Sequence, residues 1–195
     1  MRLTIVGTGY VGIVTGTGFA NLGNSVICLD IDQIKIDKLI SGELTIYEPG
    51  LEEVLRRNVE KGRLHFTTDT EKAVRESEVI FLCVGTPPDS NHAADLSAVT
   101  EAASAIGRYM DGYRVVVNKS TVPVGTADFV KKIISENQKK KIPFDVVSNP
   151  EFLREGAAVK DFENPARIVI GTDSKKAEKI MTSLYRSVAR TDRPV

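Results

Sequence analysis

The stretch Leu3-Thr4-Ile5-Val6-Gly7-Thr8-Gly9-Tyr10-Val11-Gly12 decides the fold of this chain. The apolar run Leu3–Val6 predicts a short buried strand, and a helical pattern follows at once. The three glycines between and within these elements fit G-x-G-x-x-G, in which Gly7 permits a tight turn, Gly9 lets the backbone approach a pyrophosphate, and Gly12 lets the helix pack closely on the strand. Free N–H groups at the start of the helix favour that anion. The stretch therefore predicts a dinucleotide-binding unit.

Short apolar runs alternate with helical patterns along the rest of the chain. We expect strands at Leu3–Val6, Ser25–Asp30, Leu64–Thr67, Val79–Val84, Arg114–Asn118, Phe144–Val147 and Arg167–Ile170. We expect helices at Val11–Leu22, Gln33–Ile40, Leu51–Glu60, Leu96–Tyr109, Thr126–Lys139 and Lys175–Val188. Such alternation predicts βαβ units, and the nearly continuous apolar strands predict a sheet covered on both faces. The fold class is therefore α/β, with a Rossmann-type, doubly wound, mostly parallel sheet and helices on both faces.

Composition limits the function classes. The chain has 26 basic and 26 acidic side chains, and this balance argues against a nucleic-acid partner, which needs a basic excess on one face. The longest apolar run, Val79–Val84, is too short to cross a membrane. Cys28 and Cys83 lie in apolar runs and predict buried side chains rather than a disulfide framework, so we expect a cytoplasmic protein. His65 and His92 lie far apart in sequence, and no metal site is expected.

Asp30 ends the second predicted strand, at the position where a ribose-binding carboxylate belongs. A 2′-phosphate there would bring like charges to about 5 Å, at a cost of about 3 kcal/mol per unit charge for an effective dielectric constant near 20. We therefore expect NAD rather than NADP as the cofactor. Two alternatives remain: Asp30 or Asp32 only caps the next helix, or the pattern belongs to a methyltransferase.

Three further stretches lie at the carboxyl ends of predicted strands and carry residues suited to chemistry. They are Cys83–Pro88, Lys119–Thr126 and Asn149–Gly156. Open α/β sheets bind ligands at the carboxyl ends of their strands, which favours a functional role for each stretch. Each can also be only a turn into a helix, with Thr126 as an N-cap, Pro150 as a first-turn proline and Glu151 as a first-turn acid.

Together the motifs resemble the UDP-glucose/GDP-mannose dehydrogenase family over all 195 residues. The resemblance rests on five motifs in order: Gly9-Tyr10-Val11-Gly12, Glu48-Pro49-Gly50-Leu51, Val84-Gly85-Thr86-Pro87, Ser120-Thr121-Val122-Pro123 and Asn149-Pro150-Glu151-Phe152. Within the family, the segments Arg154–Gly156 and Asp161–Ile168 look more like the UDP-glucose branch, because the GDP-mannose branch typically has serine where Gly156 stands. The GDP-mannose and UDP-N-acetylhexosamine branches stay open. Thr45 stands where the family usually has proline.

The resemblance implies an NAD-dependent oxidoreductase of nucleotide-sugar metabolism, supplying polysaccharide precursors. It would oxidise the C6 alcohol of UDP-glucose to a carboxylate with two NAD molecules, through a cysteine thioester. Matching positions imply cofactor contacts at Gly7, Gly9, Tyr10, Val11, Gly12, Asp30, Lys35, Thr86, Thr121 and Glu155. They imply substrate contacts at Glu151, Phe152, Leu153, Arg154 and Glu155. Glu151 resembles the general base of thioester hydrolysis, and Thr121 resembles a residue that organises the catalytic water.

The family's nucleophilic cysteine matches no position here, since Cys28 and Cys83 match structural strand positions. We therefore expect residues 1–187 to form the NAD-binding domain, and residues 188–195 to begin the connection to a missing central helix and C-terminal domain. The chain by itself should be inactive, and the resemblance implies that the full-length protein is a homodimer. The alternative from another class is a stand-alone module that binds NAD or a nucleotide sugar and performs no chemistry.

Overall fold

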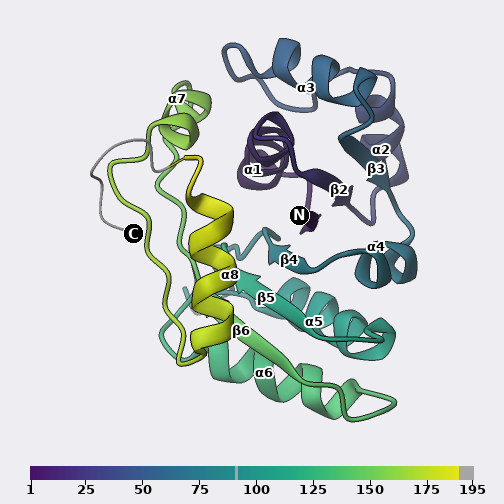
Figure 1. Cartoon of the computed structure of the whole chain (residues 1–195), viewed down its shortest axis with the longest axis vertical. Coiled ribbons are helices and arrows are strands. Elements are labelled where there is room, and N and C mark those ends of the chain that lie inside the picture. Colours follow the sequence, from purple (N-terminus) through teal and green to yellow (C-terminus); the bar gives the residue numbers. More distant parts are fainter. Residues whose placement is uncertain (91, 189–195) are drawn as a thin grey trace.

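Six parallel strands form one sheet in the order β3-β2-β1-β4-β5-β6, as the computed structural model of residues 1–90 and 92–188 shows (Figure 1). The strands are β1 (Arg2–Val6), β2 (Ser25–Leu29), β3 (Leu64–Thr67), β4 (Val79–Leu82), β5 (Arg114–Asn118) and β6 (Phe144–Ser148). The helices are α1 (Tyr10–Asn21), α2 (Gln33–Ile40), α3 (Leu51–Glu60), α4 (Thr70–Glu76), α5 (Ser97–Tyr109), α6 (Thr126–Asn137), α7 (Ala158–Glu163) and α8 (Lys175–Tyr185). This strand order is that of doubly wound dinucleotide-binding sheets, with a switch point between β1 and β4.

The sheet has a hydrophobic core on each face. Ile5 belongs to the core that α1, α2, α3, α7 and α8 cover, whereas the next residue, Val6, belongs to the core under α4, α5 and α6. Phe81 and Leu82 of β4 divide in the same way, because successive side chains of a strand point to opposite faces. Helices α5 and α6 lie together at the lower edge of Figure 1. The predicted fold class, with helices on both faces, is confirmed.

The predicted strand Arg167–Ile170 is wrong. This run has no regular structure and is followed by a single antiparallel bridge between Gly171 and Ser148 of β6. Its alternating side chains Ile168 and Ile170 pack against the core, but the carbonyl of Val169 accepts a hydrogen bond from the Asn149 side chain at 2.8 Å. The Asn149 side chain therefore makes the hydrogen bond that the backbone of a neighbouring strand would otherwise make.

Sequence patterns missed two short helices, α4 and α7. Each has seven residues or fewer, which is too short to show helical periodicity. Two predicted strands also end early, so that Asp30 and Cys83 lie just beyond the sheet. The expected connection to a further region falls on residues 188–195, of which 189–195 lie outside the described residues.

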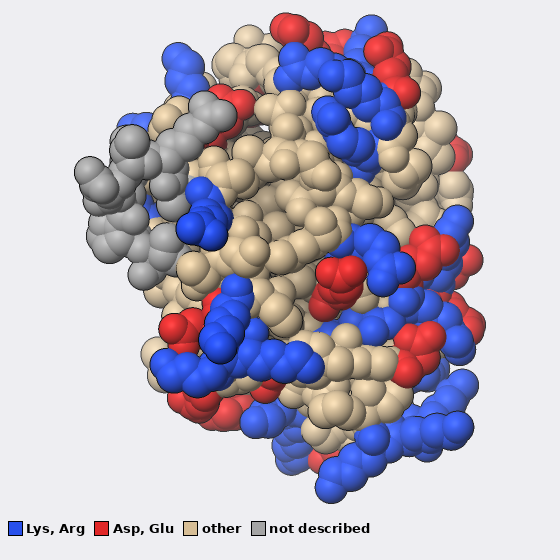
Figure 2. Space-filling model, in the orientation of Figure 1, with Lys and Arg blue, Asp and Glu red and all other residues tan. Residues whose placement is uncertain are grey.

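No helix within residues 1–90 and 92–188 has the length and the apolar composition needed to cross a bilayer. On the face drawn in Figure 2, acidic and basic side chains surround a central area of uncharged residues.

Candidate functional site

The glycine loop between β1 and α1 is closed on its inner side and open on its outer side. Gly7 has φ +97°, and a Cβ there would lie 2.8 Å from the carbonyl oxygen of Cys83. A Cβ on Gly12 would lie 1.9 Å from the carbonyl oxygen of Gly7, whereas a Cβ on Gly9 would meet nothing within 4 Å. Gly9 is the N-cap of α1, and no side chain caps this helix. The first amides of α1 are therefore available to an anion.

A cleft of about 690 Å³ extends from this loop along the carboxyl ends of β2 and β4 to α5. This volume lies within the range of small-molecule sites. Its lining includes Gly7 and Gly9, the acidic residues Asp30 and Asp32, and Lys35. The cleft thus opens at the topological switch point of the sheet, where open α/β sheets bind ligands.

Asp30 lies at the mouth of the glycine loop. Its Oδ2 accepts hydrogen bonds from the Thr8 N–H at 2.8 Å and the Thr8 hydroxyl at 2.6 Å, and its Oδ1 accepts one from the Asp32 N–H at 3.1 Å. Partial burial raises the pKa of Asp30, but these hydrogen bonds and nearby Lys35 outweigh burial, so the pKa lies below its ordinary value. Asp32 caps α2, accepting from the N–H groups of Ile34 and Lys35. The carboxylate of Asp30 is therefore charged at neutral pH.

The loops after β4, β5 and β6 meet through a chain of hydrogen bonds. The Thr86 hydroxyl donates to the carbonyl of Thr121 at 2.8 Å, and the Thr121 hydroxyl donates to Oε1 of Glu151 at 3.0 Å. The other carboxylate oxygen of Glu151, Oε2, is buried and has no hydrogen-bond partner among the described residues. Buried polar atoms are nearly always paired, so this oxygen is an acceptor left free for a ligand or a water.

The helix-start roles that the sequence suggested for Pro150, Glu151 and Thr126 are wrong. Residues 151–154 have no regular structure, and α7 begins only at Ala158, so Pro150 and Glu151 are not first-turn residues. Gly125 rather than Thr126 is the N-cap of α6, and the Thr126 hydroxyl donates to the carbonyl of Pro123 instead.

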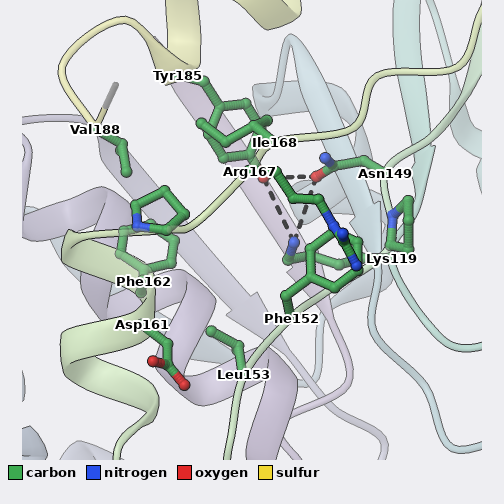
Figure 3. Close-up of a pocket in the computed structure, with 12 residues that line it drawn as sticks. Lys119, Asn149, Phe152, Leu153, Asp161, Phe162, Arg167, Ile168, Tyr185 and Val188 are labelled. Carbon is green, nitrogen blue, oxygen red and sulfur yellow. Dashed lines mark hydrogen bonds between the residues drawn. The ribbon is translucent and has the colours of Figure 1, made fainter. Parts of the chain in front are cut away.

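Sequence reasoning missed a buried polar cluster beside these loops (Figure 3). The Lys119 ammonium donates to Oδ1 of Asn149 at 3.4 Å and to the Tyr185 hydroxyl at 3.5 Å, and that hydroxyl donates to Asn149 at 2.5 Å. Burial lowers the pKa of Lys119, while the neighbouring Cys83 and Glu151 act in the opposite direction. A lysine directly after β5, whose centre is the apolar run 115–117, is the signal that could have identified it.

Cys83 lies near this cluster but is an unreactive thiol. Its side chain is buried, and burial raises its pKa to about 12. Burial also raises the pKa of Cys28, and both cysteines are free of disulfides. The prediction that both are buried side chains is confirmed. In the part of the chain that the structure describes, no three His, Cys, Asp or Glu residues come together to hold a metal ion.

The segment predicted to contact substrate follows Glu151 along the surface. Phe152 lies under the guanidinium of Arg167, 4.4 Å from the ring centroid, and Leu153 packs against the core. Arg154 forms a bidentate ion pair with Asp161 of α7, with N–O distances of 2.7 and 3.0 Å, and Glu155 is exposed. The structure thus brings Glu151 beside Thr121, while the Arg154 side chain is engaged with α7.

The Arg154–Asp161 pair predicts a pH-dependent contribution to stability. Hydrogen bonds from Arg154 lower the pKa of Asp161 from 3.8 to about 2. A carboxyl group with a depressed folded pKa stabilises the fold above its unfolded pKa and loses this contribution as pH falls through the folded value. In urea unfolding, Asp161→Asn should therefore lower the free energy of unfolding by about 1 kcal/mol at pH 6 and by almost nothing at pH 2. The effect at pH 6 is small because the Arg154 side chain is 80% exposed. A cost independent of pH would contradict this; Asp173→Asn, which removes an exposed carboxylate, is the control.

Tyr10, the first residue of α1, contacts two distant segments. Its hydroxyl donates to the buried carboxylate of Glu48 and lies 3.2 Å from the carbonyl oxygen of Arg154. Glu48 stands in one of the five motifs that carry the family resemblance, but sequence reasoning assigned it no role. Its partner Tyr10 lies 38 positions away in sequence, so a local pattern could not assign a role to this carboxylate.

Comparisons with known proteins agree with this geometry. Residues 1–189 match the NAD binding domain of the UDP-glucose/GDP-mannose dehydrogenase family. The chain is 50% identical over 185 residues to UDP-glucose 6-dehydrogenase TuaD of Bacillus subtilis, covering 95% of this chain and 40% of that protein. It is 48% identical to UDP-glucose 6-dehydrogenase of Rhizobium meliloti, covering 100% of this chain and 45% of that one.

Solved structures give the same result. A UDP-glucose dehydrogenase from Pyrobaculum islandicum superposes with a TM-score of 0.94 at 43% identity, over 99% of this chain and 45% of that one. A GDP-mannose dehydrogenase from Pseudomonas aeruginosa, solved as a ternary complex, also has a TM-score of 0.94, at 40% identity, over 100% of this chain and 45% of that one. The chain spans less than half the length of these relatives.

Proposed function

This chain belongs to the UDP-glucose/GDP-mannose dehydrogenase family, as a domain that binds a nicotinamide dinucleotide, and from that premise we propose that it is the NAD-binding part of an enzyme oxidising UDP-glucose to UDP-glucuronate. One observation carries the proposal. The open glycine loop, the Asp30 cleft and the Thr86–Thr121–Glu151 chain all lie at the carboxyl edge of one sheet. A cofactor in the cleft would then meet a substrate at Glu151. A stand-alone binding module is not favoured, because the family and the named relatives are dehydrogenases.

The proposed roles follow from position. The pyrophosphate would lie against Gly7, Gly9 and Gly12 and the N–H groups of Tyr10 and Val11. The adenosine ribose would lie at Asp30 and Lys35, and the nicotinamide side at Thr86, Thr121 and Glu155. The free Oε2 of Glu151 suits a general base that takes a proton from water attacking a thioester, because it is buried yet unpaired. Thr121, which holds the other oxygen of that carboxylate, would orient both Glu151 and the water.

The sugar nucleotide would lie along residues 151–155. UDP-glucose is favoured over GDP-mannose because the GDP-mannose branch typically has serine where Gly156 stands, and because the two curated relatives named above are UDP-glucose 6-dehydrogenases. The division of the chain at residue 187, a homodimer of the full-length protein and a cytoplasmic location belong to the same proposal. Unpaired, buried Cys28 and Cys83 support the last of these.

The experiment that tests the cofactor assignment is calorimetric titration of the chain with NAD and NADP. NAD should bind about 100-fold more tightly, because a 2′-phosphate would lie against the charged Asp30 carboxylate. Asp30→Asn should narrow this ratio to less than about tenfold by removing the repelling charge. Asp37→Asn is the matched control, since it removes an exposed carboxylate of α2 that does not line the cleft. Equal affinity of the unmodified chain for both cofactors would refute the assignment.

A further inference from the structure

Glu48 is the only acidic side chain buried in the described part of the chain, with 4% of its surface exposed. It lies in the loop that leads into α3 and does not line the cleft. A buried carboxylate is costly unless it is fully hydrogen-bonded. Its partners therefore explain why the fold keeps a charge at this position.

Those partners come from two other segments of the chain. Oε2 of Glu48 accepts from the Tyr10 hydroxyl and from the Gly156 N–H at 2.8 Å. Oε1 accepts from the Ala158 N–H at 2.9 Å, at the start of α7. The Gly156 N–H also lies 3.2 Å from the Tyr10 hydroxyl oxygen. One carboxylate thus joins the glycine loop to the end of the segment that carries Glu151 and Arg154.

Both members of the Tyr10–Glu48 pair keep their protonation states near neutral pH. Burial raises the pKa of Glu48, but hydrogen bonds from Tyr10 and from the N–H groups of Gly156, Ala158 and Val159 outweigh burial and hold it below its ordinary value. Burial and the neighbouring Glu48 raise the pKa of Tyr10 to about 12. The tyrosine is therefore a constant donor and the glutamate a constant acceptor.

We propose that Glu48 is a positioning residue that couples the dinucleotide loop to the sugar-nucleotide segment, so that each ligand strengthens binding of the other. The inference rests on the proposed function, which places a pyrophosphate on the N–H of Tyr10 and a nucleotide sugar on residues 151–155. A pyrophosphate that fixes the Tyr10 backbone also fixes its hydroxyl, and through Glu48 it orders residues 154–158. Coupling between two sites is reciprocal, so the sugar nucleotide must favour the dinucleotide equally.

Amide hydrogen exchange of the ¹⁵N-labelled chain, with and without saturating NAD, tests the coupling at the two N–H groups that Glu48 accepts. In the unmodified chain, NAD should slow exchange at Gly156 and Ala158 by about fivefold or more, because local opening of the segment becomes rarer. In Glu48→Gln, both amides should exchange about tenfold faster, and NAD should no longer slow them, although it still binds.

Two further variants separate coupling from plain stabilisation. Asp145→Asn is the matched control, because Asp145 also accepts a tyrosine hydroxyl, that of Tyr113 at 2.5 Å, but lies outside the cleft. It should lower stability and leave the effect of NAD on Gly156 and Ala158 unchanged. Tyr10→Phe keeps the hydrogen bonds that Glu48 accepts from the N–H groups of Gly156 and Ala158, and it should abolish only the NAD-dependent slowing. It therefore decides the question if Glu48→Gln does not fold.

The outcomes are distinguishable. NAD-dependent slowing that persists in Glu48→Gln or Tyr10→Phe would overturn the coupling and leave Glu48 a structural residue. NAD binding to the unmodified chain without any slowing at Gly156 and Ala158 would overturn the coupling alone. Failure of the unmodified chain to bind NAD would overturn the proposed function and the coupling with it.

Discussion

In the full-length dehydrogenase proposed above, replacing Glu151 with glutamine should slow hydrolysis of the proposed thioester by about a hundredfold to ten-thousandfold, because that is the usual cost of losing a general base. Glutamine keeps the shape and accepts the hydrogen bond of Thr121, but it cannot take a proton at neutral pH. The two hydride transfers that precede hydrolysis should be retained. The variant should therefore release a rapid burst of NADH and then stall with substrate attached to the enzyme.

Stopped-flow absorbance would measure the burst, and intact-protein mass spectrometry would detect the covalent adduct. Loss of the burst itself, with NAD affinity unchanged, would mean that Glu151 acts before hydrolysis and that its proposed role is wrong. Near-normal turnover would make Glu151 a structural residue that only pairs with Thr121. The matched control is Glu163→Gln, which alters an exposed carboxylate at the end of α7.

Gly12→Ala should lower the free energy of unfolding of the chain by about 3 kcal/mol or more. This loss is at the upper end of the range for substitutions that overpack a rigid site. The added Cβ would lie 1.9 Å from the carbonyl oxygen of Gly7 and 3.0 Å from its carbonyl carbon. Backbone atoms cannot move aside as a flexible side chain can, so α1 must shift away from β1 and the glycine loop must open. Urea unfolding would measure the loss, and NAD affinity should fall with it.

Gly9→Ala is the matched comparison, because its Cβ would meet no atom within 4 Å. Stability should stay within about 0.5 kcal/mol of the unmodified chain. NAD affinity should nevertheless fall sharply, since the new methyl group occupies the side from which a pyrophosphate approaches. A Gly12→Ala chain with unchanged stability, or a Gly9→Ala chain with unchanged NAD affinity, would contradict this division of roles.

The sequence predicted the features that depend on near neighbours along the chain. Apolar runs predicted all six strands of the sheet, and the glycine spacing predicted the turn between β1 and α1. Alternation of strands with helices predicted the parallel sheet, because parallel neighbours need a helical crossover. Residues that follow a strand, such as Asp30 and Thr86, could be placed at the carboxyl edge for the same reason.

Only the tertiary structure decided which of those residues touch. Thr121 and Glu151 are 30 positions apart, and Glu48 and Ala158 are 110 apart, so no local pattern contains their hydrogen bonds. The same holds for the cluster around Lys119, and for Arg167–Ile170, where strand propensity yielded to a hydrogen bond from Asn149. Sequence periodicity predicts secondary structure because the backbone hydrogen bonds of a helix join residues that are close in sequence. Those of a sheet repeat regularly along two paired strands. A site of single, long-range hydrogen bonds forms only when packing of the sheet and helices brings distant side chains within about 3 Å of each other.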